Sequence, residues 1–167
     1  MSQRKRKKVA ILGMASGCMR APFNQADWEV WGLNDAYLQL TNDHGQLPVD
    51  RWFELHPHSD LTLRRRPADY QKRLAAMTIP IYTLWPGNPW NVKHPIVYPL
   101  AKAIRLGRDY FACSFAYQIA LALLEGCEVI AIYGAPLVGA REGLVERPCV
   151  EWWLGFAAGR GVTVTVD

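Results

Sequence analysis

The feature that most constrains this chain is the alternation of short apolar runs with helical patterns along its 167 residues. The runs have the length of β-strands, and most of them stop at a glycine or a polar residue. Strands separated by helices pair in parallel, because each helix returns the chain to the edge of the sheet where the previous strand began. The sequence therefore predicts a single α/β domain with a mostly parallel sheet of about six strands and helices on both faces. The candidate strands are residues 9–12, 29–33, 51–55, 79–84, 129–133 and 162–166.

Two helices are indicated by capping residues as well as by apolar spacing. In "SFAYQIALALLEG" the Ser114 hydroxyl is placed to cap the first turn, and Gly126 supplies a left-handed residue that ends the helix. In "PCVEWWLGFAAG" Pro148 occupies a first-turn position and Gly159 ends the pattern. Weaker helical patterns cover residues 60–77 and the few residues after the second predicted strand.

Two stretches fit neither a strand nor a helix. Residues 85–99 contain four prolines, which exclude a central strand and an uninterrupted helix. Residues 134–148 are rich in glycine and in alternating charge, which predicts a mobile connection. Such loops either cover a site as a lid or are packed for structural reasons, with Trp85 and Trp90 as anchors of the first one. The sequence leaves both interpretations open.

Positive charge is concentrated at the N-terminus. The formal net charge is +4, and residues 4–8 carry five positive charges, so the rest of the chain sums to −1. We therefore predict a basic flexible tail over residues 1–8 and a folded domain over residues 9–167. The tail is able to contact DNA phosphates weakly, but the nearly neutral body lacks the basic face of a dedicated nucleic-acid-binding protein.

Hydropathy and cysteine usage point to the cytoplasm. No apolar run approaches the ~18 residues needed to cross a bilayer, and the run after the basic segment is too short for a signal sequence. The four cysteines, Cys18, Cys113, Cys127 and Cys149, form no CxxC pair and have no histidine nearby. We expect them to be reduced and buried, and we predict no metal ligands and no membrane partner.

The stretch "KKVAILGMASG" carries a predicted strand into a glycine-bearing turn. Ligands of parallel sheets bind beyond the carboxyl ends of the strands, where N–H groups at helix N-termini face anions. Gly13 and Gly17 would let the backbone approach a phosphate, and Ser16 offers a hydroxyl. The spacing departs from GxGxxG at Ala15, and no Walker lysine follows, so this is neither a dinucleotide fingerprint nor a kinase P-loop. A purely structural turn at Gly13 is the alternative.

Polar residues also follow other predicted strands. Asn34 and Asp35 are able to bind a base edge or a ribose hydroxyl, or instead to cap the next helix. Glu54 and His56 lie on one face of their strand, so the carboxylate can orient the imidazole as a general base. A structural histidine in a turn is the alternative for His56. With Gly134 after a further strand, candidate residues from several strands meet at one rim of the sheet.

Several segments together resemble small Rossmann-like proteins of tailed bacteriophages, which would act in the host cytoplasm: "VAILGMASG", "WGLND", "RWFELH", "FACSFAYQIALALLEGCEVIAIYGAPL" and "RPCVEWWLGFAAGRGVTV". More distantly, the order of glycine loop, Asn-bearing strand, Ser-capped helix and "IAIYG" strand is similar to bacterial sialyltransferases that use a CMP-sugar. It is also similar to hydroxymethylpterin diphosphokinase-like proteins. These resemblances imply a Rossmann-like nucleotide-binding domain. They place Gly13, Ala15 and Ser16 near phosphate, Asn34 near the nucleotide, and Ser114 at the start of the helix beside the crevice.

The sequence also departs from both distant families. The sialyltransferases have a catalytic histidine after the fifth strand, whereas this chain has no histidine after His94. The diphosphokinase-like proteins carry a metal-binding aspartate where this chain has Ala135. Catalytic groups would therefore have to come from His56, Asp35 or Glu54.

Three functions are compatible with these residues. The leading interpretation is a transferase that acts on a nucleotide or a nucleotide-sugar, with the turn stabilising the leaving phosphate. A non-catalytic module that senses or sequesters a nucleotide is the second interpretation, favoured by the missing histidine and aspartate. The third is a DNA-associated accessory protein that works through its basic tail. The sequence specifies no cofactor and no oligomeric state.

Overall fold

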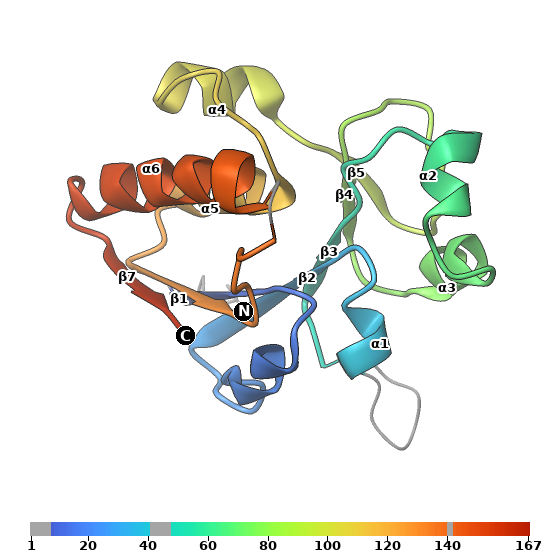
Figure 1. Ribbon diagram of the computed structural model, residues 1–167, viewed down its shortest axis with the longest axis horizontal. Coiled ribbons are helices and arrows are strands. Elements are labelled where there is room, and N and C mark those ends of the chain that lie inside the picture. The colour runs from blue at the N-terminus through green and yellow to red at the C-terminus, as the bar shows by residue number, and fades with distance from the viewer. Residues whose placement is uncertain (1–7, 41–47, 140–141) are drawn as a thin grey trace, which may run out of the picture.

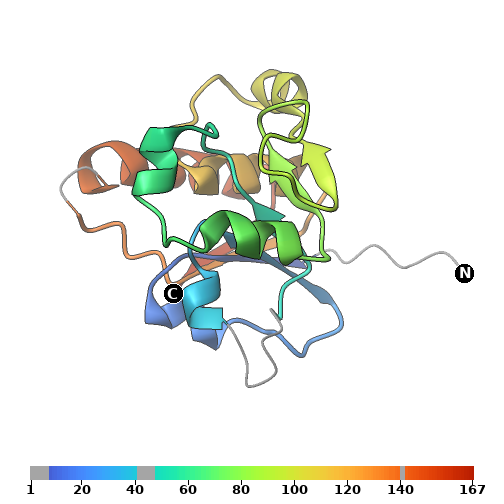
Figure 2. The same cartoon turned by 90° about the vertical axis from the view of Figure 1, so that its right-hand side faces the viewer.

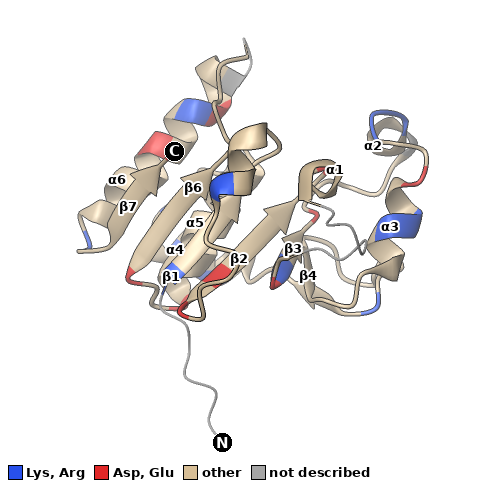
Figure 3. Ribbon diagram, turned by 90° about the horizontal axis from the view of Figure 1, so that it is seen from below, with Lys and Arg blue, Asp and Glu red and all other residues tan. Residues whose placement is uncertain are grey.

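A seven-stranded, all-parallel sheet forms the centre of the protein, with the strand order β5-β4-β3-β2-β1-β6-β7. The computed structural model describes residues 8–40, 48–139 and 142–167. Figures 1 and 3 show the strands fanning out in this order. The predicted α/β class and parallel sheet are confirmed. The strands are β1 (Lys8–Leu12), β2 (Trp28–Leu33), β3 (Arg51–Phe53), β4 (Ile81–Thr83), β5 (Pro95–Val97), β6 (Val129–Tyr133) and β7 (Thr163–Val166).

The strand missed from sequence is β5, which lies in the proline-rich stretch. Pro95 is tolerated because β5 is at the edge of the sheet and pairs only with β4. In the same stretch Trp90 is fully buried, whereas Trp85 is 45% exposed. Trp90 is therefore an anchor of this loop, as predicted, and Trp85 is not.

The helical segments follow the predicted positions with three differences. The pattern over residues 60–77 forms two helices instead of one, because Pro67 separates them. Cys113, not Ser114, occupies the N-cap of α5, and Ser114 is its first residue. The segments α4, η1 and η2 lie where no helix was predicted. The segments are η1 (Ser16–Arg20), α1 (Tyr37–Leu40), α2 (Asp60–Arg64), α3 (Tyr70–Ala76), α4 (Leu100–Leu106), α5 (Ser114–Leu124), η2 (Glu142–Glu146) and α6 (Arg147–Ala158).

Alternate residues of the strands bury two separate cores on the two faces of the sheet. Val9 and Ile11 of β1 pack with α4, α5 and α6, whereas Ala10 and Leu12 pack with η1, α1 and α3. Figures 1 and 2 show these two helical layers above and below the sheet. The prediction of helices on both faces is therefore confirmed.

A partly buried ion cluster lies near the amino end of β3. Arg51 donates hydrogen bonds to both carboxylate oxygens of Glu29 and of Glu125, at 2.7–3.0 Å, and one to the Tyr82 hydroxyl at 2.9 Å. Its guanidinium also lies over the Trp31 ring. Burial alone would lower the pKa of Arg51, but the hydrogen bonds to the two glutamates raise it above its ordinary value. This cluster connects β2, β3 and α5 on the side of the sheet away from the strand ends described below.

The structure bears on only part of the predictions made about the basic tail and about the membrane. Residues 1–7 lie outside the described residues, and Lys8, which we assigned to the tail, already belongs to β1 and pairs with Trp28 and Val129. Within the described part of the chain, no helix combines the length and apolarity needed to span a bilayer.

Candidate functional site

A pocket of about 600 Å³ lies at the carboxyl ends of the central strands. β1 has β2 on one side and β6 on the other, so the order in which strands are added to the sheet reverses here. Open parallel α/β sheets bind ligands at such a point. The volume lies within the range of small-molecule sites. The walls come from the segments that follow β1, β2, β3 and β6, and from the start of α5 and α6. The lining residues are Met14, Ala15, Leu33, Asn34, Leu55, His56, Arg66, Phe111, Ala112, Cys113, Ser114, Phe115, Tyr117, Gly134, Ala135, Pro136, Leu137 and Glu146.

Two loops pack against each other at the pocket: one follows β1 and begins at Gly13, and the other follows β6 and begins at Gly134. We call them the two glycine loops. A Cβ on Gly13 would lie 2.2 Å from the carbonyl oxygen of Gly134. The amides of Gly13 and Ala15 already donate to the carbonyls of Tyr133 and Gly134, at 2.7 and 3.0 Å. Ala15 and Gly134 line the pocket, whereas the other three residues predicted in this turn do not: Gly13, Ser16 and Gly17. The two loops can therefore pack this closely only because Gly13 has no side chain.

Asn34 and Asp35 follow β2 in a tight turn. Asn34 lines the pocket and has a positive φ of 47°, a conformation that asparagine tolerates better than most residues. Its Oδ1 atom is buried and has no hydrogen-bond partner among the described residues. Asp35 is not a lining residue, and its Oδ2 accepts a hydrogen bond from Arg66 at 3.1 Å. Asn34 therefore presents an unused acceptor at the pocket, while Asp35 holds Arg66.

Glu54 holds His56 as the sequence predicted. The Glu54 side chain is fully buried, and its Oε1 accepts from both the backbone N–H and the Nδ1 of His56, at 3.0 and 2.9 Å. Its Oε2 accepts from the Tyr70 hydroxyl. Arg66 Nη2 lies 3.1 Å from the same Nδ1. Nδ1 can either donate its own proton to Glu54 or accept a hydrogen bond from Arg66, but it cannot do both. We assign the proton to Nδ1, because a hydrogen bond to a buried carboxylate is the stronger of the two.

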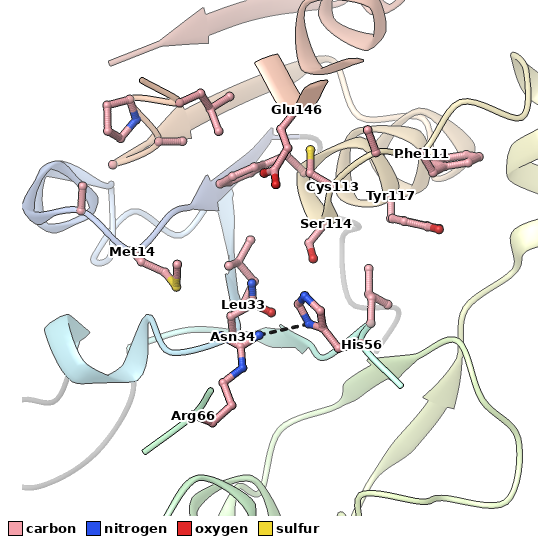
Figure 4. A pocket seen from close by; sticks show the side chains of 18 residues that line it. Met14, Leu33, Asn34, His56, Arg66, Phe111, Cys113, Ser114, Tyr117 and Glu146 are labelled. Carbon is pink, nitrogen blue, oxygen red and sulfur yellow. Dashed lines mark hydrogen bonds between the residues drawn. The ribbon is translucent and has the colours of Figure 1, made fainter. Parts of the chain in front are cut away.

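This assignment leaves the Nε2 atom of His56 available to the pocket. The imidazole lines the pocket and its side chain is 42% exposed. Figure 4 shows His56, Arg66 and Asn34 together on the side of the pocket formed by the segments after β2 and β3. Nε2 accepts a proton when the ring is neutral and donates one when the ring is charged.

The opposite wall consists of the N-terminal ends of α5 and α6. Ser114 is the first residue of α5 and Glu146 is the N-cap of α6. Cys113 and Cys149 are hydrogen-bonded to each other, and this bond is the largest influence on both thiols. It raises the pKa of Cys113 and lowers the pKa of Cys149 to about 7, and the negative charge of Glu146 raises the pKa of both. The carboxylate of Glu146 is thus close to the thiol that lines the pocket.

Sequence reasoning missed two charged lining residues, Arg66 and Glu146. Arg66 belongs to the run "RRR", which has the pattern of an exposed helix. Its guanidinium reaches back to Asp35 and His56 only because α2 ends at Arg64 and the chain turns over the strand ends. Glu146 is one charge among several in a glycine-rich connection, so no periodicity distinguishes it. Within residues 8–40, 48–139 and 142–167, no group of three or more His, Cys, Asp or Glu is arranged to hold a metal ion.

Comparison with known proteins gives one structural likeness. No protein-family model matches the chain, and no curated protein matches it. The resemblances to tailed-phage proteins and to diphosphokinase-like proteins therefore gain no support. Among solved structures, the chain is similar to the sialyltransferase CstII from Campylobacter jejuni in complex with a substrate analogue, cytidine-5'-monophosphate. The TM-score is 0.55 and the identity 13%, over 96% of this chain and 79% of that chain. The chain therefore shares the Rossmann-like α/β fold of that glycosyltransferase.

Proposed function

We propose that the protein binds a nucleotide-sugar in this pocket and transfers the sugar to an acceptor. The observation that carries the proposal is the pocket itself: it lies where the strand order reverses beside β1 and contains an imidazole held by a buried carboxylate. The likeness to a sialyltransferase solved with CMP supports the same class of ligand. Glycosyl transfer needs one group that moves a proton and others that stabilise the leaving phosphate, and the pocket contains both types.

Each lining residue has a role that follows from its chemistry. The unpartnered Oδ1 of Asn34 is suited to accept a hydrogen bond from the base or from a ribose hydroxyl. The phosphate is placed near the Ser114 hydroxyl, because the N-terminus of the 11-residue α5 favours an anion there. His56 and Arg66 contribute a proton donor and a positive charge beside that position. Ala15 and Gly134 form the floor where the two glycine loops meet.

The first experiment separates binding from turnover. Thermal-shift and calorimetric titrations with CMP, UMP, GMP and their sugar conjugates test binding, since a ligand at 100 times its Kd stabilises by about 2.7 kcal/mol. Chromatography then follows consumption of each nucleotide-sugar, with a panel of hexoses as acceptors and with and without magnesium. We expect one class of nucleotide to bind and its sugar conjugate to be consumed.

The matched variants are His56→Gln and His94→Gln. His94 is exposed beside the edge strand β5 and does not line the pocket. The His56 variant should lose turnover by ~100-fold, the scale expected when a donor to the leaving phosphate is removed. Its affinity for the nucleotide should fall less, because the glutamine amide can still donate a hydrogen bond to the phosphate. The His94 variant should behave like the parent. Tight nucleotide binding with no consumption across the panel would favour a non-catalytic binding module, and no binding at all would refute the proposal.

A further inference from the structure

We propose that Glu146 is the general base that deprotonates the acceptor hydroxyl, while the nucleotide phosphate lies between the Ser114 hydroxyl and the wall of Arg66 and His56, away from Glu146 (Figure 4). This inference rests on the proposed function, because it divides that pocket into a donor side and an acceptor side. It assigns to Glu146 a role for which the sequence offered only His56, Asp35 and Glu54.

The position of Glu146 meets the geometric requirement for a base. It lines the pocket, it is half-buried, and it is held at the junction of η2 and α6. Figure 4 shows its carboxylate beside Cys113, on the side of the pocket away from Arg66 and His56. In agreement with this position, the Glu146 charge raises the pKa of both thiols, after the larger effects of their mutual hydrogen bond and of burial.

Electrostatics place the phosphate away from Glu146. The cationic groups among the described lining residues are Arg66 and, when protonated, His56, and both are on the other wall. A phosphate beside the Glu146 carboxylate would be repelled by it, because two negative charges in contact are only partly screened near a protein surface. Glu146 is the carboxylate among the described lining residues, whereas Asp35 and Glu54 do not line the pocket and bind Arg66 and His56 behind its wall.

The same charges assign a donor role to His56. Behind the wall, Asp35 is paired with Arg66, and Glu54 binds the Nδ1 of His56. Glu54 holds Nδ1, so Nε2 is the ring atom of His56 that can contact a phosphate at this wall, where it would act as a hydrogen-bond donor. A nitrogen that donates to the phosphate cannot also take the proton of the acceptor, so that proton needs another site.

The reaction then balances as a single displacement. The acceptor O–H gives its proton to a Glu146 carboxylate oxygen, and the acceptor oxygen forms a bond to the anomeric carbon of the sugar. The bond between that carbon and the phosphate oxygen breaks, and its electron pair leaves with the nucleotide. Arg66 and His56 stabilise the negative charge that develops on the phosphate.

The test compares Glu146→Gln with Glu151→Gln. Glu151 lies on the same helix, is exposed, and forms a surface ion pair with Arg147, so its loss should change little. For the donor and hexose with the fastest parental turnover, Glu146→Gln should lower the transfer rate by ~100-fold. The Kd of the free nucleotide should stay the same or fall, because a negative charge has been removed. Added formate should restore part of the activity of Glu146→Ala, since a small carboxylate can replace the missing base.

Each failure has a distinct meaning. A parent protein that consumes no nucleotide-sugar overturns the proposed function and this inference together. Parental turnover with an unaffected Glu146→Gln variant overturns the inference alone. A tenfold weaker nucleotide Kd in that variant, with circular dichroism unchanged, would place Glu146 beside the nucleotide and also overturn it.

Discussion

Replacing Gly13 with alanine should damage the fold before it affects any ligand. The added Cβ would lie 2.2 Å from the Gly134 oxygen, 2.7 Å from the Gly134 carbonyl carbon and 3.1 Å from Cα of Ala135. All three atoms are backbone, so no flexible side chain can move away. Ordinary van der Waals contact begins at 3.4 Å, and the two glycine loops must therefore separate to accommodate one methyl group.

The size of the effect follows from what this separation breaks. The Ala15 amide donates to the Gly134 carbonyl of the other loop at 3.0 Å, and such a bond contributes about 1 kcal/mol net. Inserting a methyl into a packed contact costs a further 1–3 kcal/mol, roughly. We expect Gly13→Ala to lower the free energy of unfolding by about 2–4 kcal/mol and, for a chain of this size, Tm by about 6–12 °C.

Urea unfolding followed by circular dichroism measures this change, and Gly155→Ala is the control. Gly155 lies inside α6, and its added Cβ would meet no atom within 4 Å. That variant should be more stable by about 0.5–1 kcal/mol, because alanine restricts the unfolded chain. If Gly13→Ala unfolds within 0.5 kcal/mol of the parent, taken as about the limit of resolution for such comparisons, the packing argument is wrong. Parental stability with lost nucleotide binding would favour the phosphate role predicted from sequence.

Two further predictions concern charge elsewhere in the chain. Arg51→Met should destabilise by about 2–4 kcal/mol, because it leaves the carboxylates of Glu29 and Glu125 facing each other without their cation, and adding Glu125→Gln should recover part of the loss in urea titrations. The second prediction follows from the pKa of Cys149, which is about 7 against an ordinary 9.0 chiefly because Cys113 donates a hydrogen bond to it. A lowered pKa stabilises the fold above pH 9 and loses that contribution as pH falls through 7, so the parent should gain stability over Cys149→Ser between pH 6 and pH 8.5. The thiolate absorbance at 240 nm should appear near pH 7 and move to higher pH in Cys113→Ala; an unchanged midpoint would exclude the hydrogen bond as the cause.

Much of the architecture could be predicted from residue patterns. Residues 9–12 and 129–133 are apolar throughout because both faces of a central parallel strand are covered, and this pattern does not depend on distant contacts. Gly126 ends α5 with a φ of +75°, as a glycine after a helix should. Local patterns were less reliable for a short strand that forms only because a neighbouring strand pairs with it. The strand β5 exists because its backbone pairs with β4, in spite of its proline.

In the candidate site, too, some relations between residues could be predicted from the sequence and others could not. The sequence by itself indicated the pair Glu54 and His56, because residues two positions apart stay close in space, even though β3 ends at Phe53 and both residues follow it. It also indicated that Asn34 and Gly134 each directly follow a strand, which the structure shows to be β2 and β6, the two neighbours of β1. Only the tertiary structure decided that Arg66 reaches the pocket, that Glu146 faces it from α6, and that the space beside Gly13 is filled by Gly134. The physical reason is that these relations join residues distant in sequence, whose separation depends on how helices and loops pack over the sheet.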